Sequence, residues 1–140
     1  MYKDDDLYRR KIDEMVEVYK KVAPLCWRQG EALRRVVGHK ASSFFITPHA
    51  AYCAIRDVYL GRTDKITHRI PSMKRMYEEI YRRVLDMSRS PKYSGWSLTK
   101  LCEEVVEQEA PEFYLSPETF RGILCRERRK LRKGGRDALR

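Results

Sequence analysis

Apolar residues recur along this chain with the spacing of one helix face. In the first stretch five of them share such a face: Tyr8, Ile12, Met15, Tyr19 and Val22. The acidic run Asp4–Asp6 stands where it favours the positive end of a helix, and Pro24 stands where it ends one. The pattern therefore predicts a long amphipathic helix over the first two dozen residues.

A second and a third helix are predicted before residue 62. The second covers about 28–40, and a short apolar link at 44–46 follows it. Thr47 is a good N-cap with Pro48 in the first helical position, and Gly61 is a natural C-terminal stop. The order is helix, helix, apolar link, helix.

The rest of the chain repeats this order. Helices are predicted over about 71–88, 97–109 and 116–133, the last with Ser116 as its cap and Pro117 in its first turn. Only the two apolar links are compatible with extended pairing, and they are candidates for a short two-stranded ribbon. We therefore predict an all-α fold.

The chain also matches itself. Residues 36–48 align without a gap with 105–117, and five of the thirteen positions are identical, where average usage gives roughly one. Upstream, 17–22 align with 79–84 in the same order, and the changed offset indicates an insertion in the later segment at about 88–96.

We interpret these matches as a tandem duplication of a three-helix unit. The first unit covers 4–62, the second covers 68–134, and 135–140 form a basic tail. If the units are equivalent, aligned apolar residues should be buried alike: Phe44 with Phe113, and Val37 with Val106.

Composition adds an uneven positive charge. The 140 residues carry a net charge of +10, and 42% are hydrophobic, which is enough for a packed core. Between 121 and 140, nine Lys and Arg face only Glu127 and Asp137, so this segment holds +7. A field so concentrated attracts polyanions, and nucleic acid is the commonest of them in a cell.

The helix predicted over 116–133 carries much of this charge on one side. Its inward face includes Phe120 and Ile123, and its outward face combines arginines with the small residues Gly122 and Cys125. Guanidinium groups on such a face could reach phosphates or guanine edges. An ordinary solvated amphipathic helix is the alternative.

The segments 97–109, 110–115 and 116–133 resemble a helix-turn-helix module, although the connector is longer than the usual three or four residues. In size, charge and helix pattern the chain is similar to small accessory DNA-binding proteins of phages and mobile elements, including small terminase subunits. The resemblance implies non-catalytic binding of duplex DNA, and RNA remains an alternative. A helical protein–protein adaptor whose basic tail contacts an acidic partner is the alternative from another class.

We predict that the nucleic-acid interface lies on this helix, its tail and the inserted loop. Its residues are Arg121, Arg126, Arg128, Arg129, Lys130, Arg132, Lys133, Arg136 and Lys92. Arg34 and Arg35 give the first unit some positive surface, but they form no stripe and are expected to matter less for binding.

No motif in the chain predicts catalysis, a cofactor or a metal. The four cysteines form no C-x-x-C pair, and His49 with Cys53 matches no zinc spacing. Phosphate-binding loops, nucleophile elbows and H-E-x-x-H are absent. No apolar stretch approaches the roughly 20 residues of a membrane helix, so we expect a cytoplasmic, non-enzymatic protein without membrane partners, and its oligomeric state stays open.

Overall fold

The computed structural model describes residues 4–61 and 71–138, with side chains from 6 to 61 and from 71 to 130. All regular structure in this part is helical. The elements in chain order are α1 (Asp4–Val22), the 3-10 turn η1 (Ala23–Leu25), α2 (Gln29–Val37), α3 (Pro48–Tyr59), α5 (Pro71–Ser88), η2 (Pro91–Tyr93), α6 (Leu98–Val106) and α7 (Pro117–Ala138). The predicted all-α fold is confirmed.

Three of these helices begin at capping side chains, and the sequence predicted two of the caps, Thr47 and Ser116. The Thr47 hydroxyl accepts the Ala50 amide at 3.1 Å at the start of α3. Ser97 accepts from Lys100 at 3.2 Å at the start of α6, and Ser116 accepts from Thr119 at 3.1 Å at the start of α7. These bonds satisfy amides that have no partner inside the helix.

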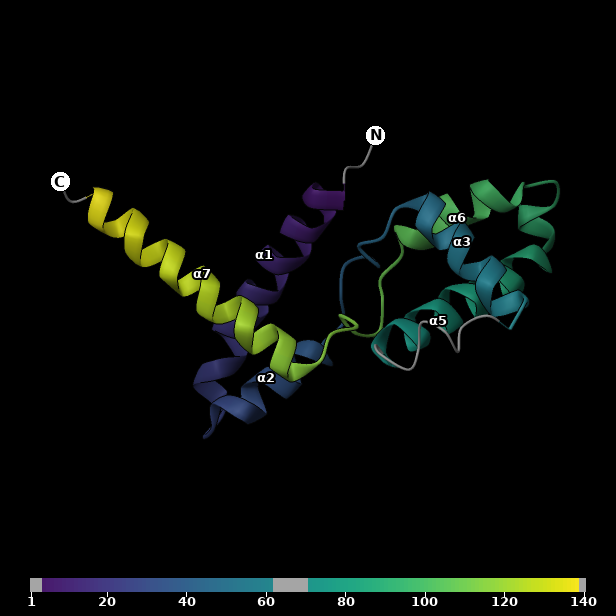
Figure 1. Cartoon of the computed structure of the whole chain (residues 1–140). Coiled ribbons are helices and arrows are strands. Elements are labelled where there is room, and N and C mark those ends of the chain that lie inside the picture. Colours follow the sequence, from purple (N-terminus) through teal and green to yellow (C-terminus); the bar gives the residue numbers. More distant parts are fainter. Residues whose placement is uncertain (1–3, 62–70, 139–140) are drawn as a thin grey trace.

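The helices form two groups joined by two extended links (Figure 1). One group contains α1, α2 and the N-terminal part of α7, and the other contains α3, α5 and α6. Each group therefore combines two successive helices with a third helix from the other half of the chain. Each helical group thus contains helices from both sequence units, 4–62 and 68–134.

This arrangement corrects one expectation. Helices α6 and α7 were expected to pack together as consecutive parts of a helix-turn-helix module. Instead α6 packs on α3 and α5, and α7 packs on α2 and α1. The ten residues between α6 and α7 carry the chain from one group to the other, so that module does not form.

The links cross between the groups and bond to each other reciprocally. Ala41 and Ala110 exchange two backbone hydrogen bonds of 2.9 Å in an isolated antiparallel bridge. The Phe44 amide donates to Val106 at 3.2 Å, and the Phe113 amide donates to Val37 at 3.0 Å. In the described chain the pairing stops at this bridge, so the links form no ribbon of strands.

Aromatic rings pack against each other where the two links cross. Phe44 stacks on Tyr114 with centroids 6.0 Å apart, and Phe45 stacks on Phe113 at 6.4 Å. Phe45 and Tyr114 both adopt the left-handed backbone region, with φ of 54° and 55°. That conformation costs a non-glycine residue about 1–2 kcal/mol, so the surrounding packing must hold both residues in place.

The buried residues include all four that the sequence alignment paired. Phe44 and Phe113 are 3% and 1% exposed, and Val37 and Val106 are 9% and 3% exposed. They belong to one continuous apolar cluster that runs through both groups. The crossing is thus part of the core rather than a surface connection.

Candidate nucleic-acid interface

Helix α7 presents an apolar face to the protein and a basic face to solvent. Phe120, Ile123 and Leu124 are buried against the first group. On the other side, the exposed cations Arg121, Arg126, Arg129 and Lys130 surround the exposed small residues Gly122 and Cys125. A Cβ built on Gly122 meets no atom within 4 Å. We call the four exposed cations with Gly122 and Cys125 the basic face.

Arg128 lies at the edge of this face and contacts α1. Its guanidinium carbon is 5.7 Å from the centroid of the Tyr19 ring, and Nη2 is 3.3 Å from the Tyr19 hydroxyl. Arg128 was expected on the outward stripe. In the structure it is exposed and bridges to α1, because its helical position flanks the buried face.

An ion-pair network fixes α7 on α1. Arg9 donates to both carboxylate oxygens of Glu127 at 2.9 Å, and to Asp13 at 2.6 and 3.0 Å. The hydrogen bond from Arg9 lowers the pKa of Glu127 and raises the pKa of Arg9 itself. The Glu127 carboxylate is thereby paired with Arg9 and does not screen the centre of the basic face. Among the described residues, its only ion-pair contact with that face is Lys130, whose ammonium lies 3.9 Å from the carboxylate.

The remaining predicted residues fall into two sets. Arg132, Lys133 and Arg136 continue along α7, but their side chains lie outside the described part of the structure. Lys92 lies in η2 between α5 and α6, where its ammonium is 5.4 Å from the centroid of the Tyr93 ring. Lys92 belongs to the other helical group, so the structure does not bring it together with the arginines of α7.

Arg34 is nearer to the basic face than the sequence indicated. It lines a small cavity of about 170 Å³ together with Gly30 and Arg121, between α2 and the start of α7. The reason is that α7 packs on α2. Arg35 is exposed and pairs with Glu31 at 2.8 Å.

Sequence reasoning also missed an exposed aromatic residue between η1 and α2. Trp27 is 99% exposed and Leu25 is 72% exposed, just before the first turn of α2. The tryptophan 69 positions later, Trp96, is covered by Tyr93 at 4.9 Å between ring centroids and by Lys100 at 4.4 Å. That match at the repeat offset was the signal that could have drawn attention to Trp27.

Other candidate chemistry has less support from the geometry. The Sγ atom of Cys53 is 3.7 Å from Nε2 of His49 on α3. Among the side chains described, those of 6–61 and 71–130, no three of His, Cys, Asp or Glu gather as metal ligands. In the same segments, no helix has the length and apolarity needed to cross a membrane.

Comparisons with protein-family models, with curated proteins and with solved structures find no match to this chain.

Proposed function

We propose that this protein binds duplex DNA without catalysis, through the basic face of α7. The observation that carries the proposal is a helix whose apolar residues Phe120, Ile123 and Leu124 are buried and whose opposite side, over the described residues, is densely cationic. Among the described residues, Arg121, Arg126 and Arg129 have no carboxylate within ion-pair distance. Uncompensated guanidinium groups attract a polyanion and can fork onto its phosphates.

The small residues in the basic face support the same proposal. Gly122 and Cys125 lie among the arginines, so the helix backbone can approach a groove closely while the guanidinium groups reach outward. Arg34 and Arg121 extend the positive surface from α7 onto α2. The proposal shares with the helix-turn-helix prediction only the use of one exposed basic helix. In that prediction α7 would pack on α6, whereas in the structure it packs on α2.

We also propose that the chain is an internal duplication whose third helices have exchanged places. Three reciprocal features at positions 69 apart support it: the Ala41–Ala110 bridge, the paired link hydrogen bonds, and the shared positive φ at Phe45 and Tyr114. Under this proposal the second unit has specialised, because α3 carries no basic face where α7 carries one.

Removing two arginines from the basic face is expected to weaken duplex binding and its salt dependence. For the double variant Arg126→Ala with Arg129→Ala, each arginine that contacts only phosphate should lower the slope of log affinity against log salt by roughly one. An arginine that reads a base should cost about 1–3 kcal/mol and relax specificity at one position. Fluorescence anisotropy with one labelled duplex at several salt concentrations measures both.

The matched control is Arg56→Ala with Arg89→Ala, which removes the same charge from exposed positions in the other helical group. Equal losses from both pairs would mean that binding follows net charge alone. A wild-type affinity that hardly responds to salt would point to the adaptor alternative, since affinity between proteins rests on a few buried anchors.

Trp27 favours single-stranded nucleic acid, DNA or RNA, as a second candidate. An indole 99% exposed beside Arg28 offers a stacking surface for an unpaired base, and such stacking is worth about 1–3 kcal/mol per base. The chain has two tryptophans, so Trp96→Phe leaves Trp27 as the only one. We expect the emission of this variant to be quenched by a single-stranded oligonucleotide, with little change on adding the matching duplex.

Trp27→Phe, which keeps Trp96 as the reporter, is the control for that titration. Trp96 is already covered by Tyr93, so its emission should change little. If Trp27 emission stays constant while a single strand binds, the second candidate is wrong.

A further inference from the structure

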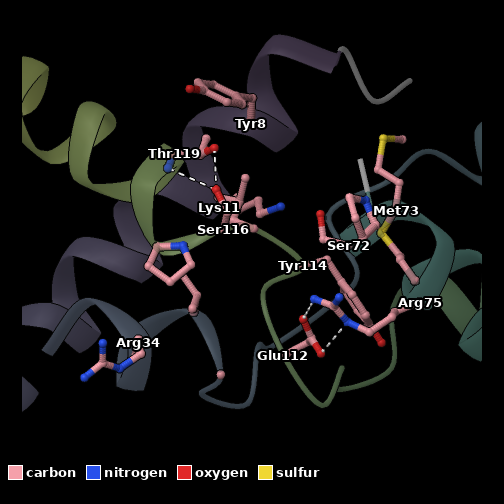
Figure 2. A pocket seen from close by; sticks show the side chains of 16 residues that line it. Tyr8, Lys11, Arg34, Ser72, Met73, Arg75, Glu112, Tyr114, Ser116 and Thr119 are labelled. Atoms are coloured by element: carbon pink, nitrogen blue, oxygen red, sulfur yellow. Dashed lines mark hydrogen bonds and ion pairs between the residues drawn. The ribbon is translucent and has the colours of Figure 1, made fainter. Parts of the chain in front are cut away.

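A cavity of about 790 Å³ lies between the two helical groups, on residues that the basic face does not use (Figure 2). Its walls come from α1, the end of α2, the start of α5, the second link and the start of α7. This volume is within the range of about 300–1,000 Å³ that is common for sites of small molecules. Apolar side chains supply much of the lining: Val37, Met73, Met76, Leu115 and the prolines 71 and 117.

Lys11 is the one lysine in the lining of this cavity. It extends from α1, and in Figure 2 its ammonium points into the cavity toward Ser72 of α5. The side chain is half-buried, and within the described residues no carboxylate lies within ion-pair distance of it. A half-buried ammonium without a counter-charge is costly, and an anion in the cavity would compensate it.

Two other cations line the cavity, and neither competes with Lys11. Arg34 has no ion pair among the described residues, but its guanidinium points away from Lys11 and Ser72 in Figure 2. Arg75 is neutralised by Glu112 through contacts of 2.9 and 3.3 Å. The Ser116 and Thr119 hydroxyls are 2.8 Å apart and belong to the cap of α7. The buried Ser72 hydroxyl faces the cavity beside Lys11 (Figure 2).

We propose that this cavity binds a small monoanion with an apolar body, such as a carboxylic acid with a hydrocarbon chain. Its carboxylate would accept hydrogen bonds from the Lys11 ammonium and the Ser72 hydroxyl. Its apolar part would lie against Met73, Met76 and Leu115, and flexible methionines adapt to varied apolar shapes. Lys11 is the one uncompensated cation of the lining that points toward Ser72, and a single positive charge at that point favours a monocarboxylate over a doubly charged phosphate.

Decanoate is the probe for this site, and 1-decanol is its uncharged counterpart. A ligand that binds only the folded chain raises its thermal midpoint, so both are titrated into the full-length protein below micelle-forming concentrations at neutral pH. The pKa of Lys11 is about 8, and at neutral pH the amine is therefore still largely protonated. We expect decanoate to raise the midpoint and decanol to raise it much less.

Lys11→Met keeps the length of the side chain and removes its charge, and we expect it to weaken decanoate binding at least tenfold. Lys20→Met is the matched control, because Lys20 is exposed on the same helix and is not part of the cavity. Leu115→Trp, which fills the apolar end, should weaken both probes. Equal binding to Lys11→Met and wild type, equal binding of decanol, or no response to decanoate would each overturn the proposal.

Discussion

Replacing Phe113 by Ala is expected to lower the free energy of unfolding by about 3–5 kcal/mol. Phe113 is 1% exposed and stacks on Phe45, and its amide ties the second link to Val37. Deleting the ring removes buried apolar area and leaves a cavity where the links cross and both helical groups meet. Chemical denaturation followed by circular dichroism measures the loss.

Phe44→Ala tests the internal equivalence at the same time. Phe44 is 3% exposed, stacks on Tyr114 and lies 5.0 Å from the Arg83 guanidinium carbon. If the two halves are equivalent, the losses of unfolding free energy in the two alanine variants should agree within about 1 kcal/mol. That margin allows for the variation in cost that the local surroundings of a core substitution produce. A loss below about 1 kcal/mol at one position and a full loss at the other would contradict the duplication.

If an alanine variant does not fold, Phe→Leu at each position gives the comparison. That smaller change keeps an apolar side chain and removes less buried apolar area than alanine does. The ratio of the unfolding free energies lost in the two leucine variants then tests the equivalence as the alanine pair would.

Helix positions and buried faces could be predicted from the sequence because they depend on local chemistry. The caps Thr47 and Ser116 fix helix starts through bonds within one turn. The spacing of Ile12 and Met15, both fully buried, fixes which side of α1 packs inward. The same reasoning identified the buried face of α7, and hence its opposite, cationic face.

The packing of α7 on α2, and of α3 on α5 and α6, could not be predicted in this way. An apolar stripe specifies that a helix packs, but not which partner it packs on. When two halves carry similar stripes, α7 fits on α2 as well as on α6, and the local pattern is the same in either case. The choice depends on the extended links, whose crossing at Ala41 and Ala110 directs each third helix to the other group.

For the candidate site too, the exposure of individual residues could be predicted from the sequence, but their neighbours from other helices could not. The exposure of Arg121, Arg126 and Arg129 follows from the helical spacing of α7 alone. The position of Arg34 beside Arg121 follows only from the packing of α7 on α2, so no local pattern predicts it. Trp27 differs, because its match to Trp96 at the repeat offset is visible in the sequence.

Lys11→Met is expected to stabilise the protein by up to about 3 kcal/mol at neutral pH, and the gain should shrink as pH rises. Burial lowers the pKa of Lys11 from 10.5 to about 8, and one pKa unit corresponds to about 1.4 kcal/mol. Below pH 8 the amine is protonated in both states, and the native state bears the whole cost of burying the charge. Between pH 8 and 10.5 the unfolded chain binds more protons, so wild-type stability rises with pH relative to the variant.

Only the difference between wild type and variant isolates this effect. Burial also raises the pKa of Cys102 to about 11 and that of Tyr114 to about 12. Groups with raised pKa values lose their contribution as pH rises past their unfolded values, and they do so equally in both proteins. Urea denaturation of the pair at about pH 7 and about pH 10 therefore measures Lys11 alone. A stability difference that stays constant between the two would mean that the Lys11 ammonium is fully hydrated, which would also remove the reason to expect an anion beside it.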